Sequence, residues 1–506
     1  MTRTAVINVV GLTESLLGEA TPRWRKALMR GAKARIVPAF PAVTCAAQSN
    51  YLTGLPPARH GIVGNGWYDR ELAEVQFWKQ SNRLVRARKL WEDLRAQQPG
   101  FTCAKLFWWY NMYSTADYSI TPRPIYRADG RKVFDIHTWP YSIRTEIKQD
   151  LGDFPFATFW GPAAGVKSPQ GAPDAASRWI AESAKWIENK YQPTLNLIYL
   201  PHLDYALQRH GPFVRADSCS SSSVLLESAD ASDRGRGTRT STKGPPGDEP
   251  YVQLNPAILP DLRAIDAIVG DLIGCFHHQG VQVVLLSEYG ISNVTTPIHL
   301  NRLFRQQGWL TVKDELGLEM LDCGASRAFA VADHQVAHIY LQDPSLESAV
   351  RSLLERQPGL HQVLGEAEQA ALRINHPRAG DLLAVAKADA WFTYYYWLDD
   401  ARAPDFARTV DIHRKPGYDP VELFLDPARK LAKARIAWRL LKKRLGFRTL
   451  MDVIPLDATL VKGSHGRRPE SPADWPILIS ENASLLPEKP LDSTDVYSVL
   501  RRHLLA

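Results

Sequence analysis

The sequence predicts an α/β protein with a mostly parallel sheet, helices on both faces and an inserted α+β cap. Short β-branched and aliphatic runs at residues 4–10, 194–200 and 281–287 are typical of strands that are buried on both faces. Amphipathic segments at 174–190 and 262–277 alternate with these runs, and such alternation indicates parallel pairing. From about residue 297 helical and strand patterns mix and aromatic residues cluster, which indicates a separate cap.

The chain has 506 residues, which is too long for one ordinary compact core. We expect the first part of the core at 1–296, the cap at 297–453 and the return of the chain to the core at 454–506. Residues 218–249 are rich in Ser, Gly, Asp and Arg and poor in large apolar side chains. Such a segment cannot bury enough surface to order itself, so we predict a disordered insertion there.

The net charge of +7 favours a small anionic substrate. The basic residues are mostly dispersed, and the densest group, at 430–448, predicts one helix with a solvated basic face, so no nucleic-acid polymer is expected. The sequence contains no stretch of eighteen apolar residues, so no membrane span is expected. The five cysteines contain no CxxC pair and indicate neither a disulfide framework nor a zinc ribbon. With a strand directly at the N-terminus, the expected compartment is the cytoplasm.

In parallel sheets ligands bind at the carboxyl ends of the strands, so the polar residues that follow each strand matter most. These are residues 11–14, 202–210 and 288–293. The most informative segment is 40–69, FPAVTCAAQSNYLTGLPPARHGIVGNGWYD. Here Thr44 ends an apolar run and precedes the Ala46–Ala47 pair, as expected of a turn that leads into a tightly packed helix and exposes a hydroxyl.

This segment resembles the type I phosphodiesterase/nucleotide pyrophosphatase branch of the alkaline phosphatase superfamily. That pattern reads F-P-x-x-T, then T-G-x-x-P, then H-G-I-x-x-N. It is matched in order and spacing by Phe40, Pro41, Thr44, Thr53, Gly54, Pro57, His60, Gly61, Ile62 and Asn65.

The resemblance implies that Thr44 is the nucleophile and that Asn65 and the backbone N–H of Cys45 bind the substrate. The alternative for Thr44 is a helix N-cap, which is a common role for threonine. Cys45 is a weaker candidate nucleophile, because nothing in the sequence around it would lower the pKa of its thiol. We expect His60 to be a structural hydrogen-bonding residue.

The family holds two zinc ions, and three further positions match its ligand motifs. Asp204 lies in the second motif, Glu288 takes the carboxylate position of the third, and His465 matches the fourth in GSHG. The cofactor implied is a divalent metal, zinc in the family, with one or two ions bound.

Three other ligand positions depart from the family pattern, because they hold Val10, Gln208 and Tyr289. The remaining oxygen donors favour a harder ion such as Mg, Mn or Ca, or one ion in place of two. Several residues could supply the missing ligands, and the sequence does not choose among them: Asn8, Thr13, Glu14, His202, His210, the pair Asp333–His334, and Asp411 with His413.

Together these features predict a metal-dependent hydrolase of phosphoester, phosphodiester or phosphonate bonds that uses a threonine nucleophile. The alternatives are a degenerate, non-hydrolytic member that binds an anionic metabolite or a partner protein, and an enzyme that transfers a phosphoryl group. The aromatic runs at 107–110 and 391–397 could stack a ligand, although core packing is the default. If the hydrolase hypothesis holds, Thr44, Asp204, Glu288 and His465 meet at one edge of the sheet.

Overall fold

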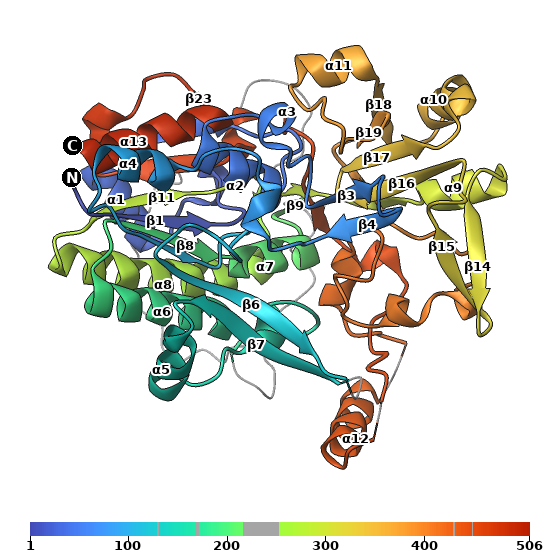
Figure 1. Ribbon diagram of the computed structural model, residues 1–506, viewed down its shortest axis with the longest axis horizontal. Helices are drawn as coiled ribbons and strands as arrows, with labels where there is room; N and C mark the ends of the chain where they lie inside the picture. Colours follow the sequence, from blue (N-terminus) through green and yellow to red (C-terminus); the bar gives the residue numbers. More distant parts are fainter. Residues whose placement is uncertain (129–130, 167–171, 216–251, 429–430, 448) are drawn as a thin grey trace, which may run out of the picture.

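The computed structural model describes residues 1–506 except 129–130, 167–171, 216–251, 429–430 and 448. The predicted insertion at 218–249 lies outside the described residues. A nine-stranded mixed sheet forms the centre of the larger part of the molecule, on the left in Figure 1. Its order is β23 (Leu491–Asp492), β2 (Ala32–Val37), β22 (Ile477–Ser480), β11 (Gln282–Leu286), β1 (Thr4–Val9), β8 (Leu195–Leu200), β5 (Cys103–Leu106), β6 (Tyr118–Tyr126) and β7 (Lys132–Trp139).

The three predicted buried strands lie side by side at the middle of this sheet. β1 pairs in parallel with β8 on one side and with β11 on the other. All six residues of β1 are buried, as expected for a strand covered on both faces. This confirms the predicted fold class, and it brings the carboxyl ends of three strands together at one edge.

Helices cover both faces of the sheet (Figure 1). α1 (Pro22–Arg30), α5 (Ser142–Leu151), α6 (Ala175–Tyr191) and α8 (Leu259–His278) lie on one face. α2 (Thr44–Thr53), α4 (Leu90–Gln97) and α13 (Val496–Leu505) lie on the other, and the short α3 (Pro57–His60) follows α2. The two amphipathic segments predicted as helices correspond to α6 and α8.

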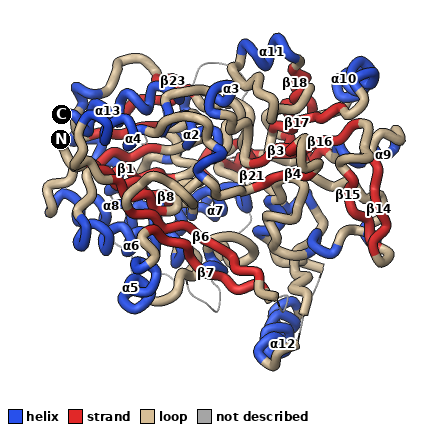
Figure 2. Tube along the Cα trace, viewed as in Figure 1, coloured by secondary structure: helices blue, strands red, loops and turns tan. Residues whose placement is uncertain are grey.

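The cap contains a four-stranded antiparallel sheet, on the right in Figure 1, with the order β16 (Ala328–Asp333), β17 (Val336–Leu341), β19 (Leu382–Ala386) and β18 (Leu360–Leu364). Around it lie α9 (Leu300–Gln306), α10 (Glu347–Glu355), α11 (Glu366–Ala371) and the hairpin of β14 (Thr311–Glu315) and β15 (Leu318–Asp322). Figure 2 shows that loops make up much of this part. Where the cap begins and ends stays a prediction.

Smaller pairs of strands complete the molecule. They are β3 (Gly66–Asp69) with β4 (Glu74–Phe77), β9 (Phe213–Arg215) with β10 (Val252–Leu254), β12 (Ser292–Asn293) with β21 (Gly463–Ser464), and β13 (Thr296–Ile298) with β20 (Ala390–Phe392). The pairing of β12 with β21 carries the segment before His465 back to the strand that follows β11. Residues far apart in the sequence therefore meet at the same edge of the sheet.

Among the described residues, the two largest hydrophobic cores lie around the large sheet and within the cap. The aromatic run 107–110 is buried, and the run 391–397 lies wholly in the second core. Core packing, the default expectation, holds for the run 391–397, whereas Trp109 and Tyr110 of the first run also line a small pocket.

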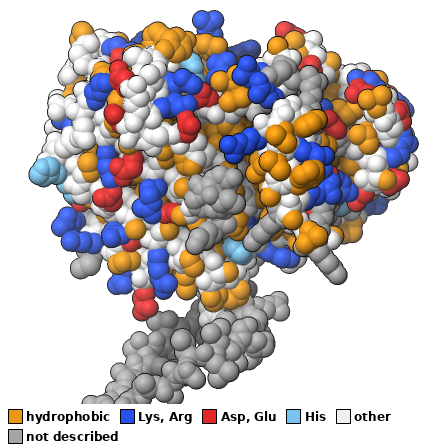
Figure 3. Space-filling view, turned by 90° about the horizontal axis from the view of Figure 1, so that it is seen from below, with side chains coloured by type: hydrophobic (Ala, Val, Ile, Leu, Met, Phe, Trp, Pro, Cys, Tyr) orange, Lys and Arg blue, Asp and Glu red, His pale blue; other side chains and the backbone are white. Residues whose placement is uncertain are grey.

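The predicted basic helix is α12 (Ala432–Arg444), which projects from the body at the bottom of Figure 1. Lys and Arg side chains are interspersed with acidic and apolar ones over the face in Figure 3. No helix of the described part of the chain is long and apolar enough to cross a membrane.

Candidate active site

Thr44 is the first residue of α2, directly after the extended residue Val43 (φ −134°, ψ 156°). Val43 therefore occupies the N-cap position that was the alternative role for Thr44. Small residues such as Ala46 and Ala47 let the whole helix pack inside the protein, and every residue of α2 is buried. The helix ends at Gly54, whose left-handed backbone (φ 67°) suits glycine.

A short hydrogen-bonded chain joins Thr44 to Asp204. Oγ1 of Thr44 lies 3.1 Å from the hydroxyl of Tyr289, and that hydroxyl donates to Oδ1 of Asp204 at 3.3 Å. Nε2 of Gln208 donates to the other oxygen of Asp204 at 2.7 Å. Burial raises the pKa of Asp204 to about 7, against the smaller opposing effect of these two hydrogen bonds. One hydroxyl thus links the candidate nucleophile to a carboxyl group.

Glu288 lies on the same side of α2 and is completely buried. Its Oε1 accepts hydrogen bonds from Nδ2 of Asn8 at 2.5 Å and from Nε2 of Gln48 at 2.6 Å. Burial raises the pKa of Glu288 to about 8. Asn8, one of the possible replacement ligands, is therefore a hydrogen-bond donor to Glu288.

The other two possible replacements near the first strand lie elsewhere. The hydroxyl of Thr13 bonds to that of Ser15, and the carboxylate of Glu14 pairs with Lys33 and Arg35. The sequence could not separate these candidates from Asn8, because all three flank the same strand end.

His465 lies beside Asp204, as predicted for a shared site. Its Nδ1 donates to the carbonyl of Ala42 at 2.7 Å, and its Nε2 is 3.9 Å from Oδ1 of Asp204. Burial lowers the pKa of His465 well below its usual range, so the ring is neutral. The structure thus places Thr44, Asp204, Glu288 and His465 near one another, with the hydroxyl of Tyr289 between Thr44 and Asp204.

His465 belongs to a stack of four aromatic rings, here called the ring stack: Tyr289, His465, His334 and Tyr418. The ring centroids of His465 lie 3.6 Å from those of Tyr289 and 3.7 Å from those of His334. His334 in turn stacks on Tyr418 at 3.6 Å, and the hydroxyl of Tyr418 donates to Gln208. The stack thus returns to the carboxyl group of Asp204 through Gln208.

The cap delivers His334 to this stack from the turn between β16 and β17. Asp333 and Val336 are paired, so the turn has only two residues, and His334 has a φ of 62°. This left-handed conformation is uncommon for a residue other than glycine, and strain of this kind concentrates at functional sites. In the sequence, Asp333 and His334 are only a polar pair within an apolar segment, and substrate contact, metal binding and a structural role are all open for them. The structure shows that His334 lies in the site.

Asn65 is held in place by Asp333. The backbone N–H and Nδ2 of Asn65 donate to the two oxygens of Asp333 at 2.8 and 3.0 Å. Its Oδ1 accepts a hydrogen bond at 3.0 Å from the backbone N–H of Cys45. The two groups expected to bind substrate are therefore adjacent and bonded to each other. Burial raises the pKa of the Cys45 thiol well above its usual range, which disfavours a thiolate nucleophile.

The remaining sequence candidates have other partners. His60 bonds to Asn50 and accepts from the backbone of Ile62, as expected of a structural residue. His202 lies 2.7 Å from Asp261 on α8. His413 faces the carbonyl of Phe77, and the backbone N–H of Asp411 donates to Glu422. Asn255 donates to the carbonyl of His210.

The donor set does not fit the zinc pair that the family resemblance implies. Val10 has no ligand atom, while Gln208 and Tyr289 direct hydrogen-bond donors at Asp204. Among the residues that the structure describes, no three His, Cys, Asp or Glu side chains are grouped so that they could hold a metal ion. Arg209, whose guanidinium could have neutralised Asp204, donates instead to the carbonyls of Ala164 and Leu423.

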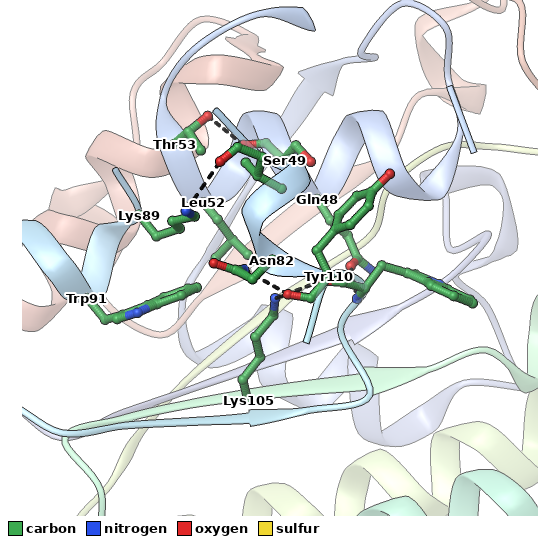
Figure 4. A pocket seen from close by; sticks show the side chains of 11 residues that line it. Gln48, Ser49, Leu52, Thr53, Asn82, Lys89, Trp91, Lys105 and Tyr110 are labelled. Carbon is green, nitrogen blue, oxygen red and sulfur yellow. Dashed lines mark hydrogen bonds between the residues drawn. The ribbon is translucent and has the colours of Figure 1, made fainter. Parts of the chain in front are cut away.

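A cavity lies against another face of α2 (Figure 4). It is small, about 10 Å³, and its lining includes Gln48, Lys89, Lys105 and Tyr110. Nζ of Lys105 donates to the backbone carbonyls of Trp109 at 2.6 Å and of Tyr110 at 2.9 Å. The N–H of Trp109 donates to Oε1 of Gln48, so the lining of this cavity supports the residue that bonds to Glu288.

The profile of the family described as type I phosphodiesterase / nucleotide pyrophosphatase matches residues 4–419. A search of curated protein sequences gives no significant match.

Solved structures of the same fold span the whole chain. Murine ectonucleotide pyrophosphatase / phosphodiesterase 5, an inactive variant in complex with AMP, is 14% identical with a TM-score of 0.53, covering 100% of this chain and 95% of its own. Phosphonoacetate hydrolase from Sinorhizobium meliloti, in complex with phosphonoformate, is also 14% identical with a TM-score of 0.53, covering 100% and 96%. At this identity the likeness establishes the fold.

Proposed function

The chain belongs to the type I phosphodiesterase/nucleotide pyrophosphatase family, and on that premise we propose that it hydrolyses a phosphoester, phosphodiester or phosphonate bond, with Thr44 as the nucleophile. The observation that carries this proposal is the hydrogen-bonded chain from Thr44 through Tyr289 to Asp204. A hydroxyl becomes a nucleophile when a neighbouring group accepts its proton. Because Tyr289 donates to Asp204, its oxygen is free to accept the proton of Thr44.

The first half of the reaction transfers the phosphorus group to the enzyme. Oγ1 of Thr44 forms a bond to phosphorus as the bond to the leaving group breaks. The proton of Thr44 moves to the oxygen of Tyr289 while the proton of Tyr289 moves to Asp204. The leaving group departs as an anion.

The second half releases the product. Water attacks phosphorus, and the bond from phosphorus to Oγ1 of Thr44 breaks. The proton held by Asp204 returns through Tyr289 to Thr44. The proton that water gives up is taken, through solvent, by the departed leaving group. Protons balance over the cycle, and the net reaction is hydrolysis.

Substrate oxygens need hydrogen-bond donors near Thr44. The amide of Asn65 gives one hydrogen to Asp333, which leaves the other for a substrate oxygen. The backbone N–H of Cys45 is the second donor in this proposal, once a substrate displaces the oxygen of Asn65. Asp333 acts as a positioning residue, since it holds both the backbone and the side chain of Asn65.

The substrate in this proposal is a small phosphorylated or phosphonate anion. The solved neighbours hold ligands of this kind, AMP in one case and phosphonoformate in the other. The net charge of +7 suits such a substrate. A non-hydrolytic role gains no support from the comparisons, because the family is one of enzymes.

We also keep the cytoplasm as the proposed compartment. The cysteines that the structure describes, Cys45, Cys103, Cys275 and Cys323, are free thiols. Disulfides are rare in reducing compartments such as the cytoplasm, and free cysteines are typical of proteins there.

The test compares Thr44→Ala with Thr44→Ser on a panel of an aryl phosphodiester, a nucleoside pyrophosphate and a phosphonate. Thr44→Ala is expected to lower kcat about a thousandfold or more, because removal of a nucleophile eliminates the covalent route. Thr44→Ser keeps the hydroxyl and retains part of the activity. Thr53→Ala, the same change at the far end of α2, is the matched control.

Mass spectrometry of wild-type protein denatured during turnover adds a direct readout. The peptide that contains Thr44 is expected to carry the phosphorus group. Turnover by Thr44→Ala at the wild-type rate on any of these substrates would remove Thr44 from the mechanism.

A further inference from the structure

The positions where the family resemblance implies metal ligands are occupied by groups that bond to each other. Asp204 receives the side-chain amide of Gln208 on Oδ2 and the hydroxyl of Tyr289 on Oδ1. A carboxylate oxygen that accepts a hydrogen bond uses a lone pair for the donated hydrogen, and that lone pair is then not available to a metal ion. Gln208 and Tyr289 thus place hydrogens on the carboxyl oxygens that would face a cation.

Glu288, on the other side of β1, receives both of its side-chain donors on one oxygen, and no hydrogen-bond partner of its Oε2 is found among the described residues. Two amide groups, from Asn8 in β1 and from Gln48 in α2, donate to its Oε1. Amide hydrogens carry partial positive charge, so two of them at one oxygen disfavour a cation at the same place. Beyond the end of β1, the side chain of Val10 supplies no ligand atom.

The histidines are arranged as stacked rings. A histidine nitrogen binds a metal along a lone pair that lies in the plane of its ring. The rings of His465 and His334 face each other at 3.7 Å with an interplanar angle of 36°, so these lone pairs do not meet at a distance of about 2.0–2.1 Å. The hydrogen bond from Nδ1 of His465 to the carbonyl of Ala42 leaves Nε2 as an acceptor, 3.9 Å from Oδ1 of Asp204.

We propose that in this protein hydrogen bonds and the ring stack have replaced the zinc pair of the family, so that the centre is assembled and works without a bound metal ion. Three substitutions account for the change: the ligand positions that hold Val10, Gln208 and Tyr289. The inference concerns the same centre as the proposed hydrolysis but does not depend on Thr44 attacking a substrate.

The test is metal analysis of the full-length protein, which needs no substrate. Wild-type protein is purified without chelator, incubated with excess zinc, passed through gel filtration and analysed for zinc, manganese and magnesium. Each metal is expected at far less than one ion per chain. One zinc ion or more per chain, retained by wild type and lost in Asp204→Ala, would overturn the proposal.

A restored variant asks whether the three substitutions are the cause. Val10→Asp, Gln208→His and Tyr289→His are combined in one protein, and the retained zinc is expected to rise about tenfold or more, since even the partners of metal ligands change affinity by that much. The matched control combines Val10→Ile, Gln208→Asn and Tyr289→Phe, which add neither a carboxylate nor an imidazole. A restored variant that folds, by circular dichroism and gel filtration, yet takes up no more zinc than the control would also overturn the proposal.

The outcomes separate this inference from the proposed function. Zinc bound by wild type together with inactive Thr44→Ala would remove the inference and keep the nucleophile. Wild type without bound metal, together with an active Thr44→Ala variant, would keep the inference and remove Thr44 as the nucleophile. If the restored variant does not fold, the metal content of wild type still decides, because that measurement needs no variant.

Discussion

Two parts of the centre differ in how they relate to the family pattern. One is the segment of the proposed nucleophile, residues 40–65, here called the nucleophile segment or nucleophile wall, and the other is the set of strand ends opposite it, here called the strand-end wall. The nucleophile segment matches that pattern in order and spacing, and the structure places Thr44 at the start of α2 with Asn65 beside it. The strand ends keep Asp204 and Glu288 but surround them with amide and hydroxyl donors.

The two walls have different chemical requirements. The hydroxyl of Thr44 needs a turn and a proton acceptor, and both can be supplied by hydrogen bonds. Carboxyl groups at the strand ends need either a cation or donors to satisfy them when they are buried. The structure shows donors at both Asp204 and Glu288, so we expect changes on this wall to act through hydrogen bonding.

The largest effect is expected where the two walls touch. Tyr289→Phe removes the hydroxyl between Thr44 and Asp204 but keeps the ring in the stack. The loss of this proton path is expected to lower kcat about a hundredfold, within the usual range for general-base assistance, with little change in KM. Steady-state kinetics on the best substrate of the panel measures it.

Tyr418→Phe is the comparison for this prediction, because its hydroxyl contacts Gln208 and not Thr44. Its loss in kcat is expected to be at least several times smaller. Equal losses in the two variants would mean that the ring stack as a whole, and not the bond to Thr44, sets the rate.

Glu288 tests whether the strand-end wall is held by hydrogen bonds. In Glu288→Ala the amides of Asn8 and Gln48 lose their acceptor while buried, which is expected to cost about 3 kcal/mol of unfolding free energy. In Glu288→Gln the amide oxygen still accepts both bonds, and the expected cost is below about 1 kcal/mol. Urea unfolding of both variants distinguishes them, and an equally large cost for Gln would point to a charge requirement at this position.

Asp333 tests the support of the nucleophile wall from the cap. Asp333→Asn keeps one oxygen but turns an amide group toward a donor of Asn65, so we expect a loss of about 2 kcal/mol in unfolding free energy. KM should rise, because Asn65 is no longer held for the substrate. Asp343→Asn, at an exposed turn of the cap, is the control. An unchanged KM would show that Asn65 keeps its place without Asp333.

The sequence predicted the fold and the meeting of four distant residues because both depend on patterns that it records. Buried strands at 4–10, 194–200 and 281–287 imply a shared edge, and the polar residues after them have to lie there. The nucleophile segment is continuous in the sequence, so its residues could be matched one by one.

What the sequence could not give is what fills the places of the missing ligands. From the sequence, Val10, Gln208 and Tyr289 show only that the usual ligand atoms are missing at these positions. That Gln208 and Tyr289 both donate to Asp204 follows from packing between α7 (His202–His210) and the end of β11. The arrival of His334 depends on the docking of the cap and on an uncommon backbone conformation, neither of which has a sequence signal.

The smallest effect is expected behind the nucleophile wall, at Lys105. Its ammonium group is completely buried, and burial lowers its pKa from 10.5 to about 7. In the unfolded chain the group keeps its ordinary pKa, so between pH 7 and about 10 the unfolded state binds more protons than the folded state. Stability from this group is therefore lost as the pH falls toward 7 and gained as it rises.

Lys105→Met removes this dependence, so the unfolding free energy of wild type should rise by about 1 kcal/mol more than that of the variant between pH 7 and pH 8. Among the groups that face Lys105, the thiols of Cys45 and Cys103 have pKa values raised by burial and stay neutral in this range. The pKa of Lys89 is lowered by burial as well, so Lys89→Met is measured alongside to separate its share. Urea unfolding at the two pH values gives the result. Parallel pH profiles for wild type and Lys105→Met would mean that the carbonyls of Trp109 and Tyr110 hold a permanently charged ammonium group, and that the support behind Gln48 is ionic.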